Sequence, residues 1–275
     1  MTAALAVACA LFGLYVGLYL NLAIDLLPTK KPMRPLRAGC RNCLDPSTSD
    51  RRLPVLPWLV RPLVPGPAGR PLRSGPSGRG RRCQVCGERV SVRYAVVEVA
   101  CAALFASAAI RLGVDAALPA YLVFFACLLV VSVIDLEYSI IPNRIVYPTI
   151  FTSLPLLALA ALVDDDLGRL ATALLGAAIA FAVLFVVHLI SPESMGFGDV
   201  RLSFILGLFL GWLGLSHVVA GLFLGFALGA LAGVGLMLTR RRGRKDSVPF
   251  GPFLAGGAAL AVLFGRPLIS WWLRS

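Results

Sequence analysis

The sequence predicts an all-α, polytopic membrane protein with about eight transmembrane helices and one long basic loop. Hydrophobic residues make up 58% of the 275 residues, which is more than a soluble fold needs, because such a fold must also cover its core with polar surface. Apolar runs of about the length that crosses a hydrocarbon core recur along the chain. The basic residues gather in the loops on one side of these runs. Together these three observations indicate a membrane protein with a defined topology.

Eight apolar runs are the candidate spans. They lie at about residues 3–27, 94–112, 117–135, 145–163, 169–190, 200–213, 215–238 and 250–272. The run at 200–213 is short and rich in glycine, so it either tilts little, thins the bilayer locally or merges with its neighbour. No basic region precedes the first run and no small-residue cleavage site follows it, so we expect a retained span and not a signal peptide.

The net charge of +12 is distributed as a membrane topology requires. Of the 26 Lys and Arg residues, 15 lie between Lys30 and Arg93, and 22 in total would fall on one side of the membrane. The other side would carry four: Arg111, Arg169, Arg266 and Arg274. The positive-inside rule therefore puts the N-terminus outside and the basic loops in the cytoplasm, where the run 240–245 would touch anionic lipid. We expect the lipid bilayer, and no nucleic acid, as the partner of this charge.

The basic loop divides the chain into a first span (1–28), a cytosolic loop (29–93) and a seven-span membrane domain (94–275). The loop is rich in Pro, Gly, Ser and Arg, and it holds two CxxC motifs, formed by Cys40, Cys43, Cys83 and Cys86. Each motif can present two thiolates to one tetrahedral metal ion, and a disulfide is not expected in a reducing cytosol. The sequence therefore favours a structural zinc site over free thiols. The remaining cysteines, which we expect to pack as small apolar residues inside spans, are Cys9, Cys101 and Cys127.

Two aspartates at the ends of apolar runs are candidate catalytic residues, because ionised side chains are costly inside a bilayer. Asp135 ends the third run and Asp199 begins the sixth, so the topology puts both on the same face at the same depth. Singly, Asp135 could be a carboxylate near lipid headgroups and Asp199 a helix N-cap. Paired, they suit peptide hydrolysis, in which one carboxylate takes a proton from water and the other, protonated, donates to the scissile carbonyl. Gly196 and Gly198 lack a Cβ, so that backbone or an extended substrate could approach Asp199 closely.

Two further acidic residues are candidates for active-site support. Glu98 lies one turn inside the second span, where we expect either a partner such as Arg93 or Arg201 or a position near the active site. Glu137 either shapes the field at the active site or is solvated. Two histidines on apolar helices are expected to be buried structural or lipid-proximal residues: His188 and His217.

The motifs around these residues resemble a known family. The segment 196–199, Gly-Phe-Gly-Asp, resembles the GxGD motif shared by prepilin peptidases, archaeal preflagellin peptidases and presenilins. Three further elements are similar to type IV prepilin peptidases in particular: Asp135 followed by Ile141-Pro142-Asn143, Ser91-Val92-Arg93-Tyr94 with Glu98, and Pro249-Phe250-Gly251-Pro252-Phe253. The paired CxxC motifs resemble those of the bacterial bifunctional branch. Two positions depart from the family pattern, namely Ala95, where Pro is usual, and Asp25, near which a basic residue is common.

The resemblance implies a GxGD-type aspartyl endopeptidase that cleaves leader peptides from type IV prepilin or pseudopilin precursors at the cytoplasmic face of the bacterial plasma membrane. It also implies N-methylation of the new amino terminus with S-adenosylmethionine, which the family associates with the cysteine-bearing loop 29–93. The residues that would bind this cofactor are not identifiable, because no glycine-rich cofactor loop is visible. Two alternatives stay open. A proton- or ion-coupled transporter would need its aspartates near the midplane, and a zinc-organised scaffold would leave the GxGD motif unexplained.

Overall fold

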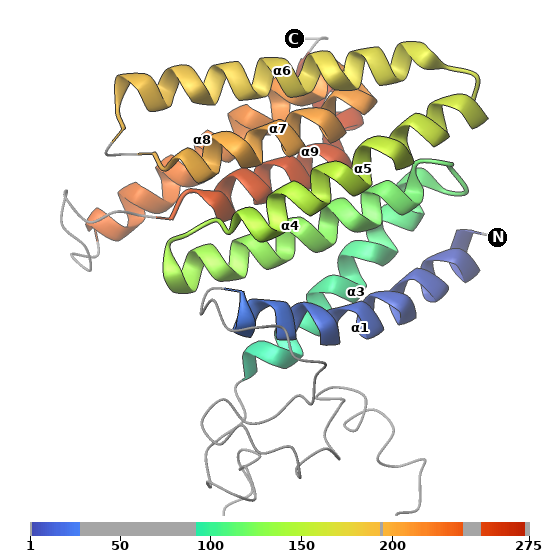
Figure 1. The fold of residues 1–275 in the computed structure, drawn as a ribbon, viewed down its shortest axis with the longest axis horizontal. Helices are drawn as coiled ribbons and strands as arrows, with labels where there is room; N and C mark the ends of the chain where they lie inside the picture. Colours follow the sequence, from blue (N-terminus) through green and yellow to red (C-terminus); the bar gives the residue numbers. More distant parts are fainter. Residues whose placement is uncertain (1, 28–91, 193–194, 239–248, 273–275) are drawn as a thin grey trace, which may run out of the picture.

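The computed structural model describes residues 2–27, 92–192, 195–238 and 249–272, and within these ranges all regular secondary structure is helical (Figure 1). The described helices are α1 (Thr2–Leu26), α3 (Val92–Leu112), α4 (Leu118–Tyr138), α5 (Asn143–Val163), α6 (Leu167–Ile190), α7 (Phe197–Leu213), α8 (Leu215–Leu238) and α9 (Gly251–Trp272). Each one covers an apolar run that the sequence analysis assigned to a span. The prediction of an all-α fold is confirmed for this part of the chain.

Six of these helices are long and apolar enough to cross a membrane, namely α1, α3, α4, α5, α6 and α8. Helix α7 has 17 residues, and the fully described part of α9 is the shorter apolar stretch Gly251–Gly265. The protein is therefore a multi-pass membrane protein, whereas the count of about eight spans remains a prediction.

Helix α4 lies at the centre of the bundle and contacts α1, α3, α5, α7 and α9. Its central position explains why its buried residues extend around the whole helix, from Tyr121 and Phe124 to Ile134. The Tyr121 hydroxyl donates a hydrogen bond of 2.7 Å to the carbonyl oxygen of Phe209 in α7, and the rings of Phe124 and Phe209 stack with their centroids 4.3 Å apart. A buried polar group and aromatic packing thus hold α4 against α7.

The most extensive contacts join α1 to α3, α6 to α7 and α8 to α9. Small residues allow this close approach. A Cβ added at Gly176 of α6 would lie 2.6 Å from the carbonyl oxygen of Gly207 in α7, and one added at Gly211 would lie 2.6 Å from that of Thr172. The three cysteines expected inside spans are buried in α1, α3 and α4, as predicted.

Consecutive helices run antiparallel, so that α4, α6 and α8 end where α5, α7 and α9 begin (Figure 1). Side-chain contacts join α1 and α3 to the same end, because Arg93 at the start of α3 pairs with Asp25 near the end of α1 and with Glu137 near the end of α4. We call this the Asp135 end of the bundle. The opposite end, where Arg169 begins α6, is called the Arg169 end.

Candidate active site

The two candidate catalytic aspartates lie at the same end of the bundle, on two helices that are distant in the sequence. Asp135 lies in the last turn of α4 and is 5% exposed, and Asp199 lies in the first turn of α7 and is 7% exposed. The two carboxylates are close enough to interact electrostatically. Both aspartates thus lie at one end of the bundle, as the alternation of apolar runs predicts.

Local backbone signals fix where α4 ends and α5 begins. Ser139 adopts a left-handed conformation (φ 52°) and donates its N–H to the carbonyl oxygen of Asp135 at 2.8 Å, which closes the helix. Pro142 then precedes α5 in an extended conformation (φ −71°, ψ 126°). Proline favours an extended residue before it and a helix after it. Ile141, between these two signals, lies against Gly198 and Gly251.

Asp135 is held by the backbone of α9. The N–H of Gly251, the first residue of α9, donates a buried hydrogen bond of 3.0 Å to Oδ2 of Asp135. A Cβ at Gly251 would lie 2.8 Å from the same oxygen, so only glycine lets the backbone approach this closely. The sequence analysis named Gly251 only as part of an element that resembles the family. The signal that could have found its role was a glycine at the start of the last apolar run.

The two glycines of the GxGD segment differ in their surroundings. A Cβ at Gly198 would lie 2.9 Å from Cβ of Ile141. The sequence analysis left the room at Gly198 open to backbone or to an extended substrate, and in the structure the protein's own Ile141 lies against this glycine. A Cβ at Gly196 would make ordinary contact, at 3.6 Å, with Oδ2 of Asp199. Gly196 therefore borders the carboxylate, and Gly198 borders the chain segment between α4 and α5.

Glu98 belongs to the interface between α1 and α3. Its side chain is 2% exposed, and Nδ2 of Asn21 in α1 lies 3.5 Å from its Oε1 and donates a second hydrogen bond, of 3.0 Å, to the carbonyl oxygen of Tyr94. A Cβ at Gly17 would lie 2.8 Å from Cα of Glu98. A buried carboxylate requires a polar partner, and the side-chain amide of Asn21 is one such partner of Glu98.

Glu137 takes part in a cluster of charges with Arg93 and Asp25. Nη1 of Arg93 donates to both carboxylate oxygens of Glu137, at 2.7 and 2.8 Å, and Nη2 of Arg93 donates to Asp25. The hydroxyl of Tyr94 donates to the other oxygen of Asp25 at 2.6 Å. Glu137 is thus exposed to solvent and also paired with Arg93. The sequence analysis noted Asp25 as a departure from the family pattern. Asp25 forms an ion pair with Arg93 and accepts a hydrogen bond from the hydroxyl of Tyr94.

Three contacts that the sequence analysis missed fasten the start of α7 and the segment before it. A ring nitrogen of His188, near the end of α6, lies 2.8 Å from the carbonyl oxygen of Met195. Arg201 donates to Oδ1 of Asn143, and its guanidinium group lies 4.6 Å from the ring centroid of Phe197. His188 and Arg201 therefore tie the GxGD segment to α6 and α5. The only sequence signal for these contacts was a polar residue near the end of an apolar run.

The predicted zinc ligands, Cys40, Cys43, Cys83 and Cys86, lie outside the described residues. Within the described ranges, no three His, Cys, Asp or Glu side chains gather as a metal site. The zinc site therefore stays a prediction. The chemistry available from the described side chains is that of two buried carboxylates, which can act as general acid and general base.

Comparisons with known proteins agree with the motifs. Residues 122–237, which include both aspartates, match the Type IV leader peptidase family. The chain is 33% identical over 264 residues to the prepilin leader peptidase/N-methyltransferase of Bacillus subtilis (strain 168), covering 96% of each chain. It is 29% identical over 294 residues to the protein of that name from Aeromonas hydrophila, covering 96% of this chain and 92% of the relative. No solved structure matches. By its similarity over nearly its whole length and by the family match around both aspartates, the chain belongs to the type IV leader peptidase family.

Proposed function

We propose that the protein is a membrane aspartyl endopeptidase that removes leader peptides from type IV prepilin or pseudopilin precursors, with Asp135 and Asp199 as the catalytic pair. The observation that supports this most is the meeting of two buried carboxylates from α4 and α7 at one end of the bundle, in a chain of this family. Relatives over nearly the whole chain carry the name prepilin leader peptidase/N-methyltransferase.

The proposed reaction uses the two carboxyl groups in opposite protonation states. The ionised one takes a proton from water, whose oxygen attacks the scissile carbonyl carbon, while the protonated one gives its proton to the carbonyl oxygen. Collapse of the resulting diol breaks the C–N bond as the leaving nitrogen is protonated. Two contacts would hold the carboxyl groups in position during these steps: the hydrogen bond from the N–H of Gly251 to Asp135, and the contact of Ile141 with Gly198.

The Asp135 end is proposed to face the cytoplasm. Both strongly basic segments of the sequence, 30–93 and 240–245, connect helices at this end, and the positive-inside rule puts such segments in the cytoplasm. The aspartates lie at helix ends, which does not favour a transporter with charges at the midplane. The apolar helix of a precursor would lie among the spans and present its scissile bond at the boundary.

A second activity is proposed from the printed names of the relatives, which include N-methyltransferase. The methyl group would pass from S-adenosylmethionine to the amino terminus that cleavage exposes. We assign this activity to the loop 29–93, nearly all of which lies outside the described residues. Mass spectrometry of the cleaved product, with and without added S-adenosylmethionine, tests it by the mass of one methyl group.

The test of the protease is cleavage of a prepilin-like precursor by purified protein in detergent. Asp135→Asn and Asp199→Asn should each reduce cleavage to a few per cent of wild type or less, because each removes a carboxyl group that the acid and base pair requires. Asp165→Asn is the matched control: Asp165 is exposed at the Arg169 end with φ 52°, a conformation that asparagine tolerates. Substantial cleavage by either folded variant would rule that aspartate out as catalytic.

A further inference from the structure

The chain from the end of α4 to the start of α5 contacts the start of α7 at two points. Ile141 lies against Gly198, because a Cβ added at this glycine would lie 2.9 Å from Cβ of Ile141. Two residues later, Oδ1 of Asn143 accepts a hydrogen bond from Nη1 of Arg201. Both contacts therefore join the chain that follows one proposed catalytic helix, α4, to the start of the other, α7.

The spacing of these residues is matched on the two sides. Pro142 is extended (φ −71°, ψ 126°), and in an extended segment side chains two positions apart point the same way. On a helix, positions three apart lie on one face. Ile141 and Asn143 can therefore meet Gly198 and Arg201 at the same time, as they do in the structure.

The second contact adds an orientation that the first cannot supply. A single contact at Gly198 fixes the distance between the two chain segments but leaves α7 able to rotate about that point. The hydrogen bond from Arg201, three positions along the same face, removes that rotation. Because successive residues of a helix are about 100° apart, a rotation of α7 would swing Asp199, the neighbour of Gly198, relative to Asp135.

Arg201 is itself held by the aromatic ring of Phe197. Its guanidinium group lies 4.6 Å from the centroid of that ring, which belongs to the residue four positions earlier on the same face of α7. The centroid of the Phe197 ring lies 5.6 Å from that of His188 and 6.5 Å from that of Phe185, both in α6. A guanidinium group on an aromatic face has less conformational freedom, so Arg201 is preorganised to donate to Asn143.

We propose that Arg201 is a positioning residue, which sets the direction of the Asp199 carboxyl group by locking α7 onto Asn143. This inference rests on the proposed function, because the reaction that needs this direction is the cleavage of a precursor. Positions 199 and 201 are about 200° apart around the helix, so the two side chains leave α7 on different sides. Arg201 therefore acts through geometry and does not touch the reacting atoms.

The test is steady-state cleavage of a prepilin-like precursor by the full chain in detergent, with kcat and KM measured separately. Arg201→Gln and Asn143→Ala each remove one partner of the hydrogen bond, and each should lower kcat roughly tenfold with little change in KM, since a misplacement of about 1 Å can cost roughly a hundredfold. The double variant should be no slower than Arg201→Gln alone, because both changes remove the same contact. Asn143→Asp keeps an oxygen acceptor at the same place and should retain most of the wild-type kcat.

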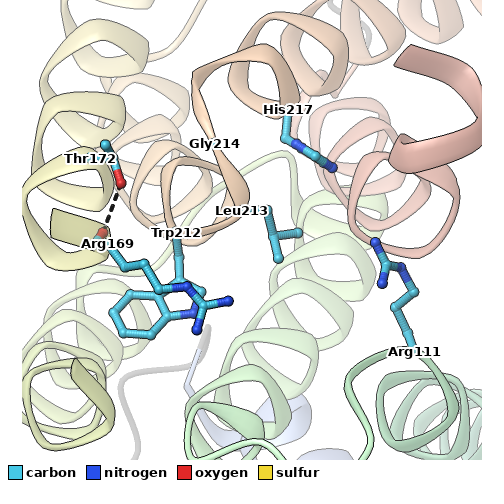
Figure 2. A pocket seen from close by; sticks show the side chains of 7 residues that line it. All are labelled: Arg111, Arg169, Thr172, Trp212, Leu213, Gly214 and His217. Carbon is cyan, nitrogen blue, oxygen red and sulfur yellow. Dashed lines mark hydrogen bonds between the residues drawn. The ribbon is translucent and has the colours of Figure 1, made fainter. Parts of the chain in front are cut away.

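Two other arginines provide matched controls. Arg144→Gln removes the same charge from the neighbouring, exposed position of α5, so it separates surface charge from the contact itself. Arg169→Gln removes an arginine that also lies beside an aromatic ring, 5.3 Å from the centroid of Trp212. That pair lies at the Arg169 end of the bundle, in the lining of a small cavity (Figure 2). Both controls should cleave like wild type, and Tm shows which variants are folded at the assay temperature.

The outcomes distinguish this inference from the proposed function. No cleavage by wild type would refute the proposed function and this inference with it. Cleavage by wild type together with wild-type kcat in folded Arg201→Gln would overturn the role of Arg201 alone. So would a rise in KM at constant kcat, or an equal loss of kcat in Arg144→Gln. If Arg201→Gln does not fold, Asn143→Ala and Asn143→Asp decide the matter, because equal turnover in these two variants would also overturn the role.

Discussion

Gly198→Ala tests whether the segment between α4 and α5 sets the geometry of the proposed catalytic pair. The new methyl group would lie 2.9 Å from Cβ of Ile141, whereas ordinary contact begins at 3.4 Å, so that one of them must move by about 0.5 Å. Shortening Ile141 would not relieve this contact, because it involves Cβ itself. Ile141 also lies against Gly251, because a Cβ added at Gly251 would lie 3.3 Å from Cδ1 of Ile141. A displacement of Ile141 would therefore reach the backbone that holds Asp135.

The size of the effect follows from the tolerance of catalytic geometry. Productive groups are held within about 0.5 Å, and a misplacement of about 1 Å can cost roughly a hundredfold in rate. We therefore expect kcat to fall roughly tenfold. Overpacking destabilises by about 1–3 kcal/mol, and the better helix propensity of alanine returns up to about 1 kcal/mol of this. The net loss in the free energy of unfolding is then about 0–3 kcal/mol.

The assay is steady-state cleavage of a prepilin-like precursor, with Gly256→Ala as the control. Gly256 lies in α9, and its added Cβ would make an ordinary contact of 3.6 Å with Leu228. If Gly198 serves Ile141, then kcat falls. If Gly198 instead leaves room for substrate, then KM rises. Wild-type kcat in Gly198→Ala would refute the role assigned to Ile141.

Three other perturbations have defined outcomes. Gly251→Ala puts a methyl group 2.8 Å from Oδ2 of Asp135, so cleavage should fall roughly tenfold or more, and wild-type turnover would contradict the role of Gly251. Arg93→Gln leaves Asp25 and Glu137 without the cation between them. It should lower the free energy of unfolding by roughly 1–3 kcal/mol, seen as a lower Tm in detergent, and an unchanged Tm would show that the cluster adds no stability. Serine at the four CxxC cysteines should remove one bound zinc ion and disturb methylation while leaving part of the proteolysis, and equal zinc in variant and wild type would rule out the site.

The sequence predicted the helices and the meeting of the two aspartates for one physical reason. Apolar runs of membrane length give helices, and alternating helices bring the end of one and the start of another to the same face. Asp135 and Asp199 had to share an end once the intervening runs were counted correctly. The structure agrees, with α4 ending and α7 beginning at the Asp135 end (Figure 1).

The sequence could not predict which helices are neighbours, since apolar runs of similar composition carry little information about lateral packing. The hydrogen bond from Gly251 to Asp135 joins residues 116 positions apart, and no local pattern specifies it. The sequence likewise did not specify the partner of Glu137, for which it allowed either solvation or an effect on the electric field at the active site. Its partner Arg93 lies on another helix, 44 positions away.

The placement of the two carboxylates suggests how an apolar bundle tolerates them. Asp199 lies in the first turn of α7, where the positive end of the helix dipole stabilises a negative charge. Asp135 lies in the last turn of α4, where the dipole has the opposite effect, but its Oδ2 accepts the first N–H of α9. Each carboxylate therefore meets a helix N-terminus, one by belonging to the helix and the other by tertiary contact. This difference makes the environment of Asp135 dependent on the docking of α9, and it explains why a glycine is needed where α9 begins.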